Sequence, residues 1–180
     1  MLELSLHILD IVNNSVKANA TKIDIEINEQ ISKNLLTISI SDNGCGMDEE
    51  FLKTVLDPFK TTRTTREVGM GLSLFQAAAR ATGGDLTISS KKGVGTKVFV
   101  TFTYDHIDRQ PIGDMAQTLV TLIISNEEID FIYRHIKDDK EFVLDTGQLK
   151  EILGDVSLNN PEIVSWITGY IKEGLAEINS

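Results

Sequence analysis

The stretch Leu36-Thr-Ile-Ser-Ile-Ser41, followed by Asp42-Asn-Gly-Cys-Gly-Met47, indicates both the fold and a candidate site. Its first half alternates apolar and polar residues, which predicts a half-buried strand. A carboxylate then stands at the strand end, before glycines that let a ligand approach the backbone. Asp42 could accept a hydrogen bond from the exocyclic amine of adenine, and would reject guanine, whose carbonyl would leave the acid unpaired. The alternative is that this segment merely ends a hairpin.

A helix is predicted over residues 3–18, because apolar residues recur there at spacings of three and four. Its other face is a polar stripe made of His7, Asp10, Asn14 and Lys17. Asn14 offers a neutral oxygen to Mg²⁺, and Lys17 could reach a phosphate oxygen. Asp10 could orient or deprotonate the group that attacks a γ-phosphate. The alternative for this stripe is a plain solvated helix face.

The first part of the chain reads as helix, two strands, a polar stretch, helix and two strands, which predicts helices gathered on one face of a mixed or antiparallel sheet. We therefore expect an α+β fold built as a two-layer α/β sandwich. The further strands are predicted at 22–28, 85–89 and 96–103, and a short helix is predicted after Asp48 that stops near Pro58.

A second helix is predicted to begin at Gly69-Met-Gly71 and to end at Gly83-Gly84. The glycines at its start supply N–H groups and the positive end of the helix dipole to a phosphate. The preceding residues 60–67 contain no apolar side chain, so we expect them to face solvent. Lys60, Arg63 and Arg66 in this stretch could close over phosphates, or could simply be solvated.

Charge divides the chain near residue 104. Residues 1–104 carry 11 Lys and Arg against 12 Asp and Glu, a net charge of −1, whereas residues 105–180 carry 6 against 15, a net charge of −9. We expect an N-terminal domain over 1–104 and an acidic α+β segment over 105–180, which either stands apart or extends the first sheet. Its acidity indicates either a solvated surface or a docking face for a basic partner. Its predicted elements are helices at 114–125, 147–153 and 161–178 and strands at 129–136 and 141–144.

The composition restricts the function. A net charge of −10 argues against nucleic-acid binding, which needs clustered Lys and Arg. No apolar run approaches the roughly 18 residues that span a bilayer, and the N-terminus is unlike a signal peptide. We therefore expect a cytoplasmic protein that does not bind membranes. A single cysteine, Cys45, excludes an intrachain disulfide.

Five ordered motifs between residues 3 and 103 resemble those of the GHKL superfamily of gyrase, heat-shock chaperone, histidine kinase and mismatch-repair ATPases. Residues 9–25 and 42–47 resemble its N-box and adenine box. Residues 57–63, 69–74 with 83–84, and 93–96 resemble the F-box and glycine boxes of the histidine-kinase catalytic domain. The resemblance implies the Bergerat ATP-binding fold, with ATP and Mg²⁺ as ligands.

The resemblance also assigns roles to individual residues. Asn14 would be the Mg²⁺ ligand, Asp42 the adenine contact, Gly46 the close-approach glycine, and Thr96 a support for the adenine end. Phe59 would anchor a flexible lid over the nucleotide. The full set of expected nucleotide-binding residues is Asn14, Lys17, Asp42, Gly44, Gly46, Met47, Phe59, Lys60, Arg63, Gly69, Met70, Gly71, Leu72 and Thr96.

Two departures from the family pattern matter. Hydrolytic members and the anti-sigma serine kinases carry Glu where this chain has Asp10, and histidine kinases commonly carry an amide or His, so the catalytic role of Asp10 is a hypothesis. The chain also begins at the N-box, so we expect no dimerising hairpin with a phosphoacceptor histidine. His7, His106 and His135 are not expected to be phosphorylated.

These features favour a stand-alone ATP-dependent regulatory protein kinase or anti-sigma-like signalling protein, which acts on a separate protein partner or phosphoacceptor. One alternative is an ATP-hydrolysing conformational clamp of the mismatch-repair or chaperone type. The other is an ATP sensor without catalysis. The sequence names neither the partner nor the oligomeric state.

Overall fold

The alternating segments of the sequence become the strands of one six-stranded sheet in the computed structural model, which describes residues 3–57 and 70–180. The predicted site residues Phe59, Lys60, Arg63 and Gly69 lie outside the described residues, as does the polar stretch 60–67. The elements are α1 (Leu4–Lys17), β1 (Lys22–Gln30), the 3₁₀ turn η1 (Ile31–Lys33), β2 (Leu35–Asp42), α2 (Glu49–Thr54), α4 (Gly71–Arg80), β3 (Leu86–Lys91), β4 (Gly95–Thr103), α5 (Met115–Ser125), β5 (Asp130–Lys137), β6 (Lys140–Asp145), α6 (Thr146–Leu153) and α7 (Pro161–Ile178).

The sheet is mixed, and its strand order is β3-β4-β2-β1-β5-β6. Neighbouring strands are antiparallel except β1 and β5, which are parallel, with Ile25 opposite Tyr133. The strands β5 and β6 come from the acidic C-terminal part. Of the two arrangements left open for residues 105–180, the structure therefore has the one in which they extend the first sheet.

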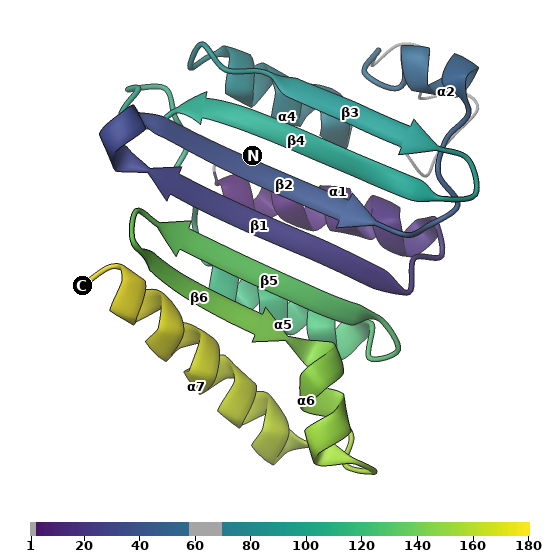
Figure 1. Cartoon of the computed structure of the whole chain (residues 1–180), viewed down its shortest axis with the longest axis vertical. Coiled ribbons are helices and arrows are strands. Elements are labelled where there is room, and N and C mark those ends of the chain that lie inside the picture. Colours follow the sequence, from purple (N-terminus) through teal and green to yellow (C-terminus); the bar gives the residue numbers. More distant parts are fainter. Residues whose placement is uncertain (1–2, 58–69) are drawn as a thin grey trace.

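Helices α1, α4 and α5 cover one face of the sheet, and the described residues place no helix on the opposite face (Figure 1). Inward positions of β1 such as Ile23, Ile25 and Ile27 are fully buried, whereas Lys22 and Asp24, on either side of Ile23, are exposed. This period-two pattern follows from the pleat of a strand with one covered face. The expected two-layer α+β fold is confirmed.

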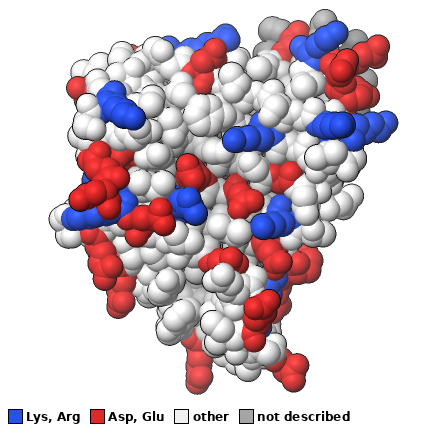
Figure 2. Space-filling view, in the orientation of Figure 1, with Lys and Arg blue, Asp and Glu red and all other residues white. Residues whose placement is uncertain are grey.

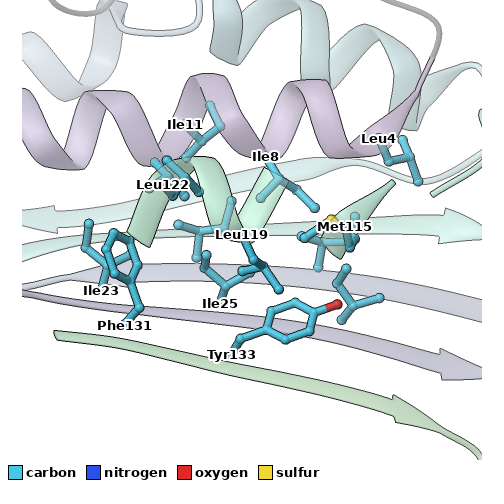
Figure 3. Close-up of a cluster of buried hydrophobic side chains, with 14 of the residues drawn as sticks. Leu4, Ile8, Ile11, Ile23, Ile25, Met115, Leu119, Leu122, Phe131 and Tyr133 are labelled. Atoms are coloured by element: carbon cyan, nitrogen blue, oxygen red, sulfur yellow. The ribbon is translucent and has the colours of Figure 1, made fainter. Parts of the chain in front are cut away.

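One hydrophobic core joins the two parts of the chain. Figure 3 shows α1 side chains, among them Ile8 and Ile11, meeting Leu119 of α5 above Ile25 of β1 and Tyr133 of β5. All five side chains are buried. Fully burying one such side chain contributes about 1.5–3 kcal/mol. The C-terminal residues are therefore part of the same packed unit as the first 104 residues.

A buried polar network also connects the two parts. Glu29 on β1 lies 2.6 Å from Nε2 of His135 on β5, and the hydroxyl of Tyr133 lies 2.7 Å from Nδ1 of the same imidazole. Tyr104 donates its hydroxyl to the other oxygen of Glu29 at 3.1 Å. Burial opposes ionisation of Glu29, but the bonds from His135 and Tyr104 outweigh it and hold the pKa of Glu29 below its usual value.

The prediction that His7 belongs to the polar face of the first helix is wrong. His7 is 3% exposed, and its ring stacks on Phe75 of α4 with the ring centroids 4.9 Å apart. Its Nε2 lies 3.0 Å from the side-chain oxygen of Gln110, in the segment after β4. Burial lowers the pKa of His7 below its usual value. The His7 side chain therefore contacts distant segments of the chain, whereas the helix pattern alone predicts that it faces solvent.

Local signals are otherwise close to their predicted positions. Asp48 caps α2 by accepting a hydrogen bond from the Phe51 amide, although this helix ends at Thr54, earlier than expected. After α4, Gly83 has a φ of +86°, a left-handed conformation that glycine adopts at little cost. Asn160 caps α7 before Pro161, as the sequence indicates.

Candidate nucleotide site

A cavity of about 440 Å³ lies between the C-terminal half of α1, the ends of β2 and β4, and the start of α4. Small-molecule sites in proteins typically measure about 300–1,000 Å³. The cavity walls are mainly apolar, with a few polar groups. The lining residues are Ile11, Asn14, Ser15, Lys17, Ala18, Ile40, Asp42, Cys45, Gly46, Met47, Asp48, Phe51, Leu72, Lys92, Thr96 and Val98.

The Asp42 carboxylate is held on the wall of this cavity. Asp42 ends β2 on the same side of the strand as the buried Ile38 and Ile40, so its side chain faces the helix layer. Ser15 of α1 donates its hydroxyl to Oδ2 at 2.6 Å, and the Gly44 amide donates to Oδ1 at 2.8 Å. Each oxygen thus has one donor from the chain, and a carboxylate can accept more than one hydrogen bond per oxygen. A ligand amine can therefore find an oriented acceptor here.

Thr96 lies beside Asp42, because the two residues are opposite one another on β4 and β2. The Ser90 hydroxyl lies 2.7 Å from the Thr96 hydroxyl, donates to the Gly95 carbonyl at 3.0 Å, and accepts from the Met47 amide at 2.8 Å. Ser90 therefore fixes the Thr96 side chain and the loop after β2 against the same hairpin.

The glycines of this loop are required by its packing. A Cβ on Gly46 would come within 2.1 Å of the Lys91 carbonyl oxygen, and the residue has a φ of +70°. A Cβ on Gly44 would come within 2.8 Å of Ala18 at the end of α1. The resemblance assigns Gly46 to close approach of the ligand. The structure gives a separate reason for glycine, since the loop backbone presses on the β3–β4 turn.

The opposite end of the site lies where α1 passes the start of α4. A Cβ on Gly71 would lie 3.1 Å from Oδ2 of Asp10, so the carboxylate is next to the first residue of α4. Helix N-termini carry a partial positive charge and free N–H groups. Leu72 is buried and lines the cavity, whereas Met70 is exposed and is not part of its wall.

The structure gathers most of the predicted binding residues around one cavity. Asn14, Lys17, Asp42, Gly46, Met47, Leu72 and Thr96 line it. Asp10, Gly44 and Gly71 lie just behind its wall, in contact with residues at either end. The ligand roles of all these residues stay predictions, including those of Phe59, Lys60, Arg63 and Gly69, which the structure does not describe.

The sequence reasoning missed several polar residues of the site, namely Ser15, Asp48 and Lys92, which line the cavity, and Ser90, which contacts Thr96. Ser15 continues the inward stripe of Leu4, Ile8 and Ile11 on α1, and Ser90 occupies an inward position of β3. Both serines stand at positions that helix or strand periodicity assigns to the core. A hydroxyl at such a position indicates a polar contact inside the fold, because a buried polar group requires a partner.

The site offers a limited set of ligands to a metal ion. Within residues 3–57 and 70–180, no group of three or more His, Cys, Asp or Glu side chains is arranged to hold one. Asn14 lines the cavity, and its side-chain amide carries an oxygen. Mg²⁺ commonly takes one or two protein oxygens and completes its shell with phosphate and water, so Asn14 fits an ion that arrives with a nucleotide.

The sheet is mixed and covered on one face, its β2 strand ends in a carboxylate on a pocket wall, and the start of α4 lies at the opposite end of that pocket. This arrangement defines an ATP-binding module of the Bergerat type. The sequence model described as "Histidine kinase-, DNA gyrase B-, and HSP90-like ATPase" matches residues 2–106. The chain belongs to this family.

The chain is similar to histidine kinases over about half of its length. It is 39% identical over 89 residues to the signal transduction histidine-protein kinase AtoS of Escherichia coli and 34% identical over 97 residues to a putative sensor protein of Shewanella frigidimarina. These alignments cover 49% and 53% of this chain. The chain spans only 14% and 15% of the length of those two relatives.

Solved structures extend the likeness into the C-terminal part. The ATPase domain of Aquifex aeolicus MutL complexed with ADP has a TM-score of 0.52 and 17% identity, covering 85% of this chain and 69% of that one. The N-terminal domain of a DNA repair protein has a TM-score of 0.54 and 18% identity, covering 81% and 53%. Each of these two alignments covers a larger share of this chain than residues 2–106 make up. The shared fold therefore includes part of residues 107–180. Among the described residues, no helix is long and apolar enough to cross a bilayer.

Proposed function

We propose that the chain binds Mg–ATP in the cavity beside Asp42 and acts as a regulatory protein kinase or anti-sigma-like signalling protein on a separate protein. The observation that carries this proposal is the Asp42 carboxylate, oriented by Ser15 and Gly44 on a mainly apolar wall. Such an acceptor suits the exocyclic amine of adenine, while the apolar walls suit the faces of the ring.

The phosphate end of the proposed complex lies toward Asn14 and Asp10. Asn14 and Lys17 are on the cavity wall, and Asp10 adjoins the start of α4. Asn14 would hold Mg²⁺, which neutralises charge on the phosphates when bound. Asp10 would accept the proton of the hydroxyl or water that attacks the γ-phosphate.

Calorimetric titration with ATP tests the adenine contact. Asp42→Asn should abolish detectable binding, because an amide replaces the acceptor and disturbs the bonds from Ser15 and Gly44. Asp24→Asn is the matched control, since Asp24 is an exposed residue on the other face of the same sheet and the charge change is identical. Unchanged ATP affinity in Asp42→Asn would show that the adenine assignment is wrong.

A neighbouring pair of asparagines tests the metal role. Asn14→Ala should weaken ATP binding in Mg²⁺ and have little effect in EDTA, because only Asn14 faces the cavity. Asn13 on the exposed side of α1 is the control, and Asn13→Ala should match the wild type in both buffers. Equal losses with and without metal in Asn14→Ala would contradict the ligand role.

The fate of the γ-phosphate separates the kinase from the alternatives. Incubation with γ-labelled ATP, alone and with cell lysate, should place label on a protein and lose that label in Asp10→Asn. Release of free phosphate without protein label would indicate the hydrolytic clamp. Neither product, with ATP binding intact, would indicate a sensor that only reports nucleotide occupancy.

A further inference from the structure

The C-terminal helix α7 is anchored on the sheet edge by one face. Ile167 and Ile171 are buried on that face. Gly174 allows the helix to approach β6 so closely that a Cβ there would come within 2.1 Å of the Phe142 ring. The orientation of α7 is thus fixed, and its opposite face is presented to solvent.

Two large aromatic side chains occupy an exposed side of α7 that adjoins its buried face. Trp166 is 53% exposed and Tyr170, one turn further on, is 40% exposed. Their rings stack with the centroids 5.2 Å apart and the planes 9° from parallel. Tyr170 also packs on Phe142, with the centroids 5.4 Å apart, so the aromatic surface continues into the core and is preorganised. Exposed Trp and Tyr side chains are among the residue types most enriched at the energetic centres of protein interfaces.

Acidic side chains surround the aromatic pair. Glu162, Glu173 and Glu177 of α7 are exposed, and none of them forms an ion pair with any residue in the described part of the chain. Lys172 is the one basic residue in the sequence of α7. In Figure 2 the lower part of the molecule, over α6 and α7, shows uncharged surface bordered mainly by acidic side chains.

Three lysines of the C-terminal part, outside α7, form contacts of their own. Lys150 lies 2.6 Å from an Asp130 carboxylate oxygen. Lys137 donates to the Asn179 side chain at 2.8 Å, and Lys140 donates to the backbone of Ser180. The contacts with Asn179 and Ser180 hold Lys137 and Lys140 at the C-terminal end of α7, at least 13 residues beyond Trp166 in the sequence, and none of the three lysines forms an ion pair with a glutamate of α7 among the described residues.

We propose that the exposed side of α7 that carries Trp166 and Tyr170, bounded by Glu162, Glu173 and Glu177, docks a basic amphipathic helix of a protein partner. Apolar residues of that helix would cover the two rings, and Arg or Lys would pair with the glutamates or lie over the indole. A second copy of this chain is disfavoured as the occupant, because the same glutamates would then face one another.

This surface lies at the far edge of the sheet from the nucleotide cavity. The cavity is built around β2 and β4, whereas α7 packs on β6 and α5 beyond the other edge (Figure 1). Docking on α7 thus leaves the cavity accessible, and the inference does not rest on the proposed nucleotide chemistry. Asp42→Asn should bind the docking peptide as the wild type does.

The experiment uses Trp166, the single tryptophan of the chain, as its reporter. The probe is a synthetic 18-residue amphipathic helix of leucine and arginine, the length of α7, titrated into the full chain. Its matched control is the same peptide with glutamate in place of arginine. The basic peptide should shift the Trp166 emission saturably, in a salt-dependent manner, and the acidic peptide should not.

Variants locate the binding surface, with affinity read from the anisotropy of a labelled basic peptide. Glu162→Lys, Glu173→Lys and Glu177→Lys combined should weaken binding at least about tenfold. The control reverses three exposed acids elsewhere in the C-terminal part, Glu128, Asp139 and Glu141, with the same change in net charge. This control should retain affinity within about threefold.

The contribution of the Trp166 ring to peptide affinity is tested with a separate control variant. Trp166→Ala should weaken the peptide at least about tenfold, whereas Phe99→Ala, which removes a 37% exposed ring from β4, should not. Equal losses in both charge-reversed variants, or unchanged affinity in Trp166→Ala, would overturn the proposal. A concentration-dependent dimer in sedimentation that Trp166→Ala abolishes would also overturn it, by showing that the face binds a second copy. Circular dichroism of each variant confirms that a loss is not unfolding.

Discussion

The buried pair of Glu29 and His135 allows a quantitative test of how strongly one contact between the two parts of the chain stabilises the fold. The two residues are 5% and 4% exposed, and their closest side-chain atoms are 2.6 Å apart. Replacing either residue alone by leucine leaves the other buried without its partner. Removing one member of such a pair typically costs about 3–5 kcal/mol.

The double variant should be far less destabilised than the sum of the single variants, because neither partner is then left unpaired. Its remaining cost comes mainly from the buried Tyr133 hydroxyl, which loses its bond to the imidazole, at about 1–3 kcal/mol. These ranges put the coupling energy between Glu29 and His135 at about 3 kcal/mol or more, the upper end of the values found for residues in contact. Urea unfolding of the four proteins near neutral pH gives this value by linear extrapolation.

A control cycle is available on the same two strands. Glu26 and Arg134 are opposite one another on β1 and β5, but they lie on the open face of the sheet. Their leucine variants should show a coupling energy below about 1 kcal/mol, as exposed pairs do. Additivity within about 0.5 kcal/mol for Glu29 and His135, or equal coupling in the two cycles, would refute the assigned role of the buried pair.

The pH dependence of the same variants has a definite sign. Since the pKa of Glu29 is lowered on folding, its contribution to stability is present above the usual value near 4.5 and is lost as the pH falls through the folded pKa. In His135→Leu the burial is no longer offset by the imidazole, so the pKa of Glu29 should rise. The free-energy deficit of His135→Leu relative to the wild type should then be largest near neutral pH and shrink toward about pH 4. A deficit that grows on acidification would contradict this reasoning.

Three further substitutions test the site and the packing of α7. Gly46→Ala should lower the free energy of unfolding by about 1–3 kcal/mol and weaken ATP binding, because its Cβ meets a backbone carbonyl at a positive φ; calorimetry of the folded variant checks this. Ser15→Ala removes a 2.6 Å hydrogen bond to Asp42 and should weaken ATP about tenfold, and unchanged affinity would show that this bond does not orient the acid. Gly174→Ala should cost about 1–3 kcal/mol in urea unfolding through its clash with Phe142, and a neutral result would contradict the close helix approach.

The sequence predicted the elements of the fold because its local patterns agree with the final packing. Ile23, Ile25 and Ile27 alternate with polar residues, and α7 begins at Pro161 after an asparagine cap. Each signal depends on neighbours within a few residues, so no knowledge of the rest of the molecule was needed.

Contacts between distant segments were beyond such patterns. The parallel pairing of β5 with β1 and the burial of His7 depend on partners far along the chain, such as Gln110, 103 residues from His7. For the site, spacing and resemblance together identified Asp42, Asn14 and Thr96 as neighbours of one cavity. They did not show that a serine on the core stripe of α1 orients the acid, since only the folded register brings the two together.

Helix α1 explains why the nucleotide site and the C-terminal part belong to one structure. Its C-terminal half supplies Asn14 and Ser15 to the cavity, while its first amides, Leu4 and Ser5, donate to the carbonyls of residues 111 and 112. Between these ends, its inward face packs against α5 as well as against β1 (Figure 3). The position of the site residues along and around α1 is therefore set partly by residues after 106, where the family match ends. The segment that matches the family does not by itself define this site, because the acidic C-terminal part completes the packing that holds α1 in place.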